Sequence, residues 1–64
     1  MRLADLISAL VDCDIINIQD STGSLYGGEC RDFKATKEIN EELLGRKVDC
    51  IRPYKNCLII LLGD

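Results

Sequence analysis

The stretch that decides the fold lies near the end of the chain and reads Cys57-Leu-Ile-Ile-Leu-Leu62. Side chains of a β-strand alternate between the two faces of a sheet. One face of this strand therefore carries Cys57, Ile59 and Leu61, and the opposite face is apolar as well. A strand that is apolar on both faces is typical of the middle of a sheet that is covered on each side.

Two further apolar patterns lie in the first third of the chain. Apolar residues recur every three or four positions from Leu3 to Val11, which indicates an amphipathic helix. From Asp14 to Asp20 they alternate with polar residues around Ile16 and Ile18, as in a half-buried strand.

The next segment is predicted to complete a hairpin. Ser21-Thr22-Gly23-Ser24 has the composition of a turn, so Leu25–Phe33 is expected to return as the second arm. Gly27-Gly28 interrupts this arm, and a glycine pair within a strand indicates a bulge or a close backbone approach.

The second half of the chain predicts a helix and a second hairpin. The helix spans Thr36–Leu44 if Thr36 caps it, and only its last turn if Asn40 does. Strands are expected at Lys47–Tyr54 and Cys57–Leu62, with Pro53 at a strand end or on a sheet edge. The order helix, hairpin, helix, hairpin predicts one α+β domain over residues 1–64, with a four-stranded, mainly antiparallel sheet.

Composition removes several kinds of chemistry. The 64 residues have a formal net charge of −3 and contain no histidine, which excludes Ser-His and Cys-His dyads and mixed Cys/His zinc sites. The acid pairs Asp12/Asp14 and Glu41/Glu42 are expected to be solvated surface groups. We therefore expect no enzymatic activity, no metal and no cofactor.

The four cysteines stand at positions 13, 30, 50 and 57, and none forms a Cys-x-x-Cys pair. Closely spaced cysteines are the usual mark of structural zinc and dithiol redox sites. Free thiols that act as small apolar groups are the favoured interpretation. Two disulfides and a dispersed four-sulfur site remain open alternatives.

No apolar run approaches the length of about 20 residues that a membrane helix needs. Asp5 interrupts the stretch that would have to be the apolar part of a signal peptide. We therefore expect a cytoplasmic protein. Its acidic balance also makes nucleic acid an unlikely partner in general, because nucleic-acid binders cluster Lys and Arg.

Core and turn positions along nearly the whole chain resemble a group of small acidic proteins that phages and prophages of Gram-positive bacteria encode, mostly of unknown function. The resemblance implies a similar fold and genetic context, without a mechanism. In that group the final strand alternates apolar and polar residues, whereas Cys57, Ile59 and Leu61 make both faces apolar here. The matching positions are Leu3-x-x-Leu6-x-x-x-Leu10, Ile16-x-Ile18-x-Asp20, Leu25-Tyr26-x-Gly28-x-x-x-Asp32-Phe33, Glu41-Glu42-Leu43-Leu44-x-Arg46-x-Val48-x-x-Ile51 and Leu58-x-Ile60-x-Leu62.

The surplus of apolar strand surface predicts association. Ile15, Cys57, Ile59 and Leu61 are expected to form an exposed patch and to make the chain a homo-oligomer, most simply a symmetric dimer. In the alternative, the second helix covers this face through Ile39, Leu43 and Leu44, and the chain stays monomeric.

Binding is the expected activity, in one of two forms. In the first, an inhibitor or adaptor of phage type meets a host or phage protein through an acidic face. In the alternative, a homo-oligomeric sponge holds a small anionic ligand, such as a nucleotide signal, through cationic and aromatic side chains. The acidic face would comprise Asp12, Asp14, Asp20, Glu38, Glu41 and Glu42, and the ligand contacts Arg31, Lys34, Arg52 and Tyr54.

Overall fold

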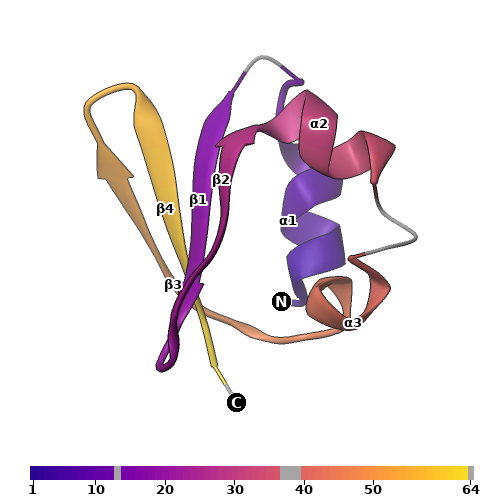
Figure 1. Cartoon of the computed structure of the whole chain (residues 1–64), viewed down its shortest axis with the longest axis vertical. Helices are drawn as coiled ribbons and strands as arrows, with labels where there is room; N and C mark the ends of the chain where they lie inside the picture. The colour runs from indigo at the N-terminus through magenta and orange to yellow at the C-terminus, as the bar shows by residue number, and fades with distance from the viewer. Residues whose placement is uncertain (13, 37–39, 64) are drawn as a thin grey trace.

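The computed structural model describes residues 1–12, 14–36 and 40–63 of the chain. The four strands form one sheet, and the three short helices lie on the same side of it (Figure 1). The chain is therefore a two-layer α+β structure. The elements follow the order α1 (Leu3–Ala9), β1 (Ile15–Asp20), β2 (Gly23–Glu29), α2 (Cys30–Ala35), α3 (Glu41–Leu44), β3 (Val48–Tyr54) and β4 (Cys57–Leu62).

The sheet is mixed, with the strand order β2-β1-β4-β3. Both predicted hairpins are present and antiparallel, but the central neighbours β1 and β4 are parallel. The expected mainly antiparallel sheet and the simple helix-hairpin alternation are thus not confirmed. The structure differs from both expectations because α2 and α3 carry the chain from one end of the sheet to the other (Figure 1). β3 therefore runs in the direction of β2, and β4 runs in the direction of β1.

The first helix and strand follow the sequence pattern closely. Leu3, Leu6 and Ile7 of α1 are buried, as the apolar stripe predicts. The helix nevertheless ends at Ala9, before the last two members of the stripe, Leu10 and Val11, and Val11 is 62% exposed. A short connection to β1 replaces the final turn.

The predicted second arm of the first hairpin is wrong beyond Glu29. Cys30–Ala35 forms the helix α2, in which Cys30 and Phe33 are fully buried. Two buried residues three positions apart share one face of a helix, whereas in a strand they would lie on opposite faces. The helix thus lets both side chains enter the core.

The predicted helix Thr36–Leu44 is also shorter in the structure. Thr36 is the residue at which α2 ends, and α3 begins after Asn40 and comprises only Glu41–Leu44. Asn40 is therefore the correct one of the two proposed caps. Residues 37–39, which the longer helix would have included, lie outside the described residues.

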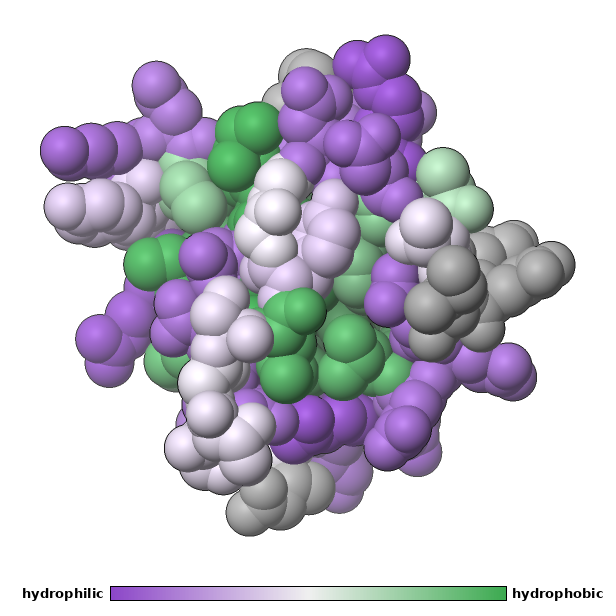
Figure 2. Space-filling view, in the orientation of Figure 1, coloured by the Kyte–Doolittle hydropathy of each residue, from purple (hydrophilic) through white to green (hydrophobic). Residues whose placement is uncertain are grey.

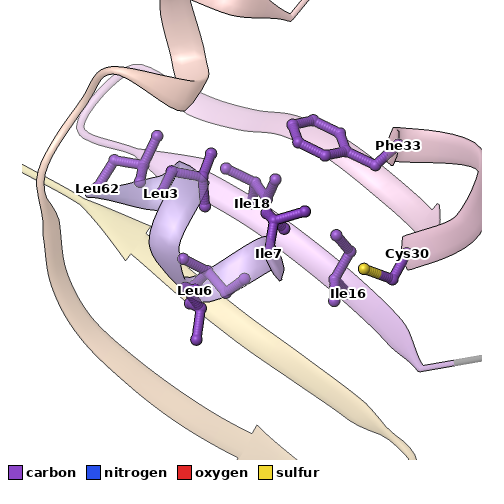
Figure 3. Close-up of a cluster of buried hydrophobic side chains, with 9 residues drawn as sticks. Leu3, Leu6, Ile7, Ile16, Ile18, Cys30, Phe33 and Leu62 are labelled. Carbon is purple, nitrogen blue, oxygen red and sulfur yellow. The ribbon is translucent and has the colours of Figure 1, made fainter. Parts of the chain in front are cut away.

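The core lies between the helices and one face of the sheet (Figure 3). Phe33 and Tyr26 pack edge to face, with ring centroids 4.9 Å apart. Leu10, Tyr26, Leu43, Leu44, Val48 and Leu58 surround the buried cluster. Its members are Leu3, Leu6, Ile7, Ile16, Ile18, Cys30, Phe33, Ile60 and Leu62.

The glycine pair of β2 serves a close approach and not a bulge. The register shift of the β1–β2 ladder falls between Ile18 and Gln19, whereas Gly27 and Gly28 pair regularly. Gly28 has a φ of +152°, and a Cβ there would lie 3.1 Å from the Tyr26 hydroxyl oxygen. The glycine makes room for that hydroxyl, which donates a 2.8 Å hydrogen bond to the Glu29 carbonyl.

None of the helices formed by the described residues has the length and apolar character needed to cross a membrane.

Candidate binding face

The candidate binding surface is the face of the sheet opposite to the helices, which we call the open face. Residues that pair across neighbouring strands share a face, and alternate positions such as Ile16 and Ile60 fill the core. No described helix packs on the open face (Figure 1). Its residues form three rows, each of which crosses the strands in the order β2, β1, β4, β3. The first row is Glu29, Ile15, Cys57 and Tyr54, the second is Gly27, Asn17, Ile59 and Arg52, and the third is Ser24, Gln19, Leu61 and Cys50.

The structure brings together all four residues predicted for an oligomer interface. Ile15 lies on β1 and Cys57, Ile59 and Leu61 on β4, which are the two central strands. Ile15 is 39% exposed and the other three are half-buried by their neighbours in the sheet. These four residues share the two central strands of the open face with Asn17 and Gln19, which also lie on β1.

The proposed cover of this face by the second helix does not occur in the described residues. Leu43 and Leu44 pack against the core, on the side of the sheet that carries the helices. Ile39, the third residue of that interpretation, lies outside the described residues. Leu43 and Leu44 therefore do not cover the open face.

Polar side chains stand beside these apolar residues on β1, and charged side chains stand on the edge strands. The Gln19 side-chain amide donates a 2.9 Å hydrogen bond to the Asn17 side-chain oxygen. Glu29 stands on the edge strand β2, where its carboxylate lies 3.4 Å from the Arg31 guanidinium in an exposed pair. Arg52 stands on the opposite edge strand, β3, and is exposed. Exposed ion pairs contribute little, so Glu29 and Arg52 remain available for a partner.

The predicted acidic face is not assembled. Asp12 and Asp14 lie in the connection between α1 and β1, at one end of the sheet, whereas Asp20 ends β1 at the other. Asp12 is paired with Lys34 at 2.8 Å, and this hydrogen bond lowers the pKa of the Asp12 carboxyl. The Asp14 carboxylate accepts a 3.1 Å hydrogen bond from the Val11 amide. Both acids are thus engaged within the chain.

Asp20 forms a structural ion pair and is not a surface acid. Its side chain is 7% exposed and accepts a 2.8 Å hydrogen bond from the Arg46 guanidinium. Hydrogen bonds from the Thr22 hydroxyl and from Arg46 lower the pKa of Asp20 to about 2. Arg46 also donates a 3.1 Å bond to the Gly63 carbonyl, so it ties the β1–β2 turn to the residue after β4.

Two predicted acids remain fully on the surface. Glu41 and Glu42 are exposed on α3. Glu38 lies outside the described residues. The described part of the predicted acidic face is therefore divided between the two ends of the molecule.

The candidate ligand contacts are likewise separated. Arg31 and Lys34 belong to α2, which follows the edge strand β2, whereas Arg52 and Tyr54 belong to the opposite edge strand. The Lys34 ammonium donates to the Leu10 carbonyl at 3.0 Å as well as to Asp12. Its cation joins α2 to the end of α1. Arg52 and Tyr54 do lie together, at the border of the open face.

A hollow of about 500 Å³ lies between the helices. Lys34, the one charged residue among those that line it, already donates its hydrogen bonds to Leu10 and Asp12. Small-molecule sites usually combine apolar walls with several convergent polar groups. On the side shown in Figure 2, apolar side chains form separate patches bordered by hydrophilic ones. The residues that line the hollow between the helices are Ala4, Ile7, Ser8, Phe33, Lys34 and Leu44.

The described cysteines are free thiols. Cys30 is buried in the core, and this burial raises the pKa of its thiol. Cys50 and Cys57 are half-buried on the open face. Cys13 lies outside the described residues. Among residues 1–12, 14–36 and 40–63, no three Cys, Asp or Glu side chains converge as metal ligands would.

Sequence reasoning missed Cys50, Asn17 and Gln19 as members of the open face. Because Asn17 and Gln19 alternate with Ile16 and Ile18, the sequence alone could have placed these two polar residues on the face opposite to the core. Cys50 had no such signal, because a register shift between Val48 and Cys50 sets its pairing with Leu61.

Comparison of the chain with protein-family models, with curated proteins and with solved structures finds no match.

Proposed function

We propose that this chain is a non-enzymatic binding protein of phage or prophage type, and that it acts in the bacterial cytoplasm by associating with other protein chains through the open face. The observation that carries the proposal is the gathering of Ile15, Cys57, Ile59 and Leu61 in the middle of a sheet face opposite to the helices. Uncovered apolar surface of this kind marks association sites.

The composition of the open face supports a protein partner over a small ligand. Apolar residues at the centre, mixed with a few polar ones and bordered by charged ones, are common in protein interfaces. Of the cations proposed for an anionic ligand, Arg31 and Lys34 stand on α2 and Arg52 on the far edge strand β3, and Lys34 is held by Asp12. A nucleotide sponge therefore has less support than protein binding.

A matched pair of substitutions tests the role of the open face. Ile59→Thr places a hydroxyl in the middle of that face and retains a β-branched side chain suited to a strand. Ile51→Thr makes the same change on the other face, because Ile51 pairs with the buried Ile60. Tagged wild-type chain and both variants are used to capture proteins from Gram-positive lysates, and each captured protein is then purified and titrated.

We expect a captured protein to bind the wild type and Ile51→Thr with similar affinity and Ile59→Thr at least about tenfold more weakly, as for a central interface residue. Equal binding to all three chains would contradict the proposal, because the open face would then not be the contact. Circular dichroism of each variant shows that the fold is retained.

A further inference from the structure

We infer that the open face binds the open face of a second copy of the chain, about a two-fold axis that runs parallel to the strands and between β1 and β4. This inference rests on the proposed function and names the partner. Two-fold pairing of identical surfaces is the commonest form of protein association. The arrangement of side chains in the three rows argues for this particular axis.

The first argument is the position of the apolar residues. Rotation about the proposed axis lays β1 of one copy over β4 of the other and keeps each row opposite the same row. The Ile59 side chains of the two copies then flank the axis as diagonal neighbours, about one strand spacing or 4.8 Å apart in projection. Ile15, Cys57 and Leu61 of both copies surround them, and each Ile59 lies over Asn17 of the other copy. The apolar residues are therefore buried at the centre of the interface together with Asn17.

The second argument is charge complementarity. The same rotation lays β3 over β2 of the second copy, so Arg52 comes to lie over Gly27, in the middle row. Gly27 has no side chain, which leaves room for the guanidinium. Glu29 is two residues further along the same strand, within reach of that guanidinium. The symmetry makes this Arg52–Glu29 contact twice, and opposite charges across an interface select its orientation.

Charge also argues against the other simple arrangement. A two-fold axis perpendicular to the strands would place the middle row over the middle row with each strand over itself. Arg52 would then face Arg52 of the second copy, and like charges in direct opposition are unfavourable. Of the two axes, the parallel one therefore fits the charges of the open face.

The small size of the face favours a weak, transient dimer. Four strands about 4.8 Å apart and six residues long, at about 3.3 Å per residue, give a projected area of about 400 Å² per copy. With the relief of the side chains, two such faces bury on the order of 1,000 Å², which is the lower end for a specific complex. We therefore expect a dimer that dissociates at micromolar concentration.

Crosslinking of native cysteines tests the axis directly. With the two-fold axis parallel to the strands, the two Cys57 residues flank the axis, whereas the two Cys50 residues are about three strand spacings or 14 Å apart in projection. With the axis perpendicular to the strands, Cys57 instead approaches Cys50 of the second copy. A short bismaleimide is added to the full chain carrying Cys13→Ser, and the linked peptides are identified by mass spectrometry. Cys30, buried on the other side of the sheet, serves as the unreactive internal control.

We expect Cys57–Cys57 links that disappear on dilution and in Ile59→Thr but persist in Ile51→Thr. A prevalence of Cys57–Cys50 links would overturn the proposed axis. A mass of 7.1 kDa at every concentration in sedimentation would overturn the second copy as the partner. That outcome leaves the proposed function to be decided separately, by the binding of Ile59→Thr to the captured protein.

Charge reversal provides an independent test. Arg52→Glu and Glu29→Arg each place like charges in both symmetric contacts, and each should weaken self-association about tenfold because the change acts twice. Mixing the two single variants restores opposite charges in both contacts, so the mixture should associate as tightly as the wild type. Failure of the mixture to associate, with both variants folded, would contradict the Arg52–Glu29 contact. Preferential pairing of Arg52→Glu with the wild type would indicate the perpendicular axis.

Discussion

The sequence predicts Asp20 as a surface acid, but in the structure its ion pair with Arg46 connects two parts of the fold. Its carboxylate is held by the Arg46 guanidinium and by the hydroxyl and amide of Thr22, and its pKa is lowered to about 2. In the unfolded chain the carboxyl returns to an ordinary pKa near 3.8. The unfolded chain therefore binds a proton more readily than the folded chain does.

This difference predicts a loss of stability in acid. The contribution of Asp20 is fully present above about pH 4 and is lost as the pH falls from there towards 2, because protonation then favours unfolding. In Asp20→Asn the contribution is absent, so the free energy of unfolding should fall less steeply over that interval. Urea unfolding at a series of pH values between 2 and 7 measures both slopes.

Thr22 provides the matched control for this prediction. Thr22→Ala removes the hydroxyl that donates to Asp20, so its stability should depend less on pH between 2 and 4 than that of the wild type. Thr22→Ser keeps the hydroxyl and should retain the wild-type slope. Parallel profiles for wild type, Asp20→Asn and Thr22→Ala would show that Asp20 does not carry the acid sensitivity.

At the scale of elements, the β3–β4 hairpin contains a residue in an unfavourable conformation. Tyr54 pairs directly with Cys57, so Lys55-Asn56 forms a two-residue connection. Lys55 has a φ of 54°, in the left-handed region that glycine adopts most readily. Its ammonium lies 5.5 Å from the centre of the Tyr54 ring, a contact that offsets part of the backbone strain.

Lys55→Gly should therefore stabilise the hairpin. Relief of the left-handed conformation outweighs the lost contact with Tyr54, and we expect the free energy of unfolding to rise by about 0.5 kcal/mol. Lys55→Ala is the control, because it loses the same contact and keeps the strain. Urea denaturation that ranked Lys55→Gly below Lys55→Ala would show that the turn is unstrained.

The elements that the sequence predicted well are those whose side-chain pattern is long or strictly alternating. α1, β1 and β4 belong to this group, and Pro53 lies in the edge strand β3 as its missing amide requires. α2 was missed because its only pattern is the spacing of Cys30 and Phe33, too short a signal to compete with the preceding strand. Contacts with the rest of the core determine such a short helix.

The composition of the open face was predictable in part for the same reason. Alternation alone places Cys57, Ile59 and Leu61 on one side of their strand. The positions of Arg52 and Glu29 at opposite edges of the same face were not predictable, because they depend on the strand order and on the parallel pairing of β1 with β4. Pairing between distant strands is decided by the whole molecule and leaves little local trace in the sequence.

At the scale of the whole molecule, stability depends on one thin core. Ile18→Val removes a single methylene group from a fully buried position and should lower the free energy of unfolding by about 1 kcal/mol. Ile15→Val makes the same change on the open side of the same strand, where Ile15 is 39% exposed, and should change stability by less than about 0.5 kcal/mol.

Urea denaturation at a concentration low enough to keep the chain monomeric compares the two variants. Equal losses would mean that Ile15 is as closely packed as Ile18. At higher concentration the proposed self-association predicts a further loss of stability for Ile15→Val, because binding of a second copy would add to the stability of the folded state.

Pro53 also decides what kind of assembly the chain can form. It lies within β3, the outermost strand on its side, and has no amide hydrogen to offer to an incoming strand. Growth of the sheet by edge-to-edge addition, the route to fibrils, is therefore hindered on the β3 side. The face-to-face pairing that we propose ends with two copies, because each open face is then covered by the other.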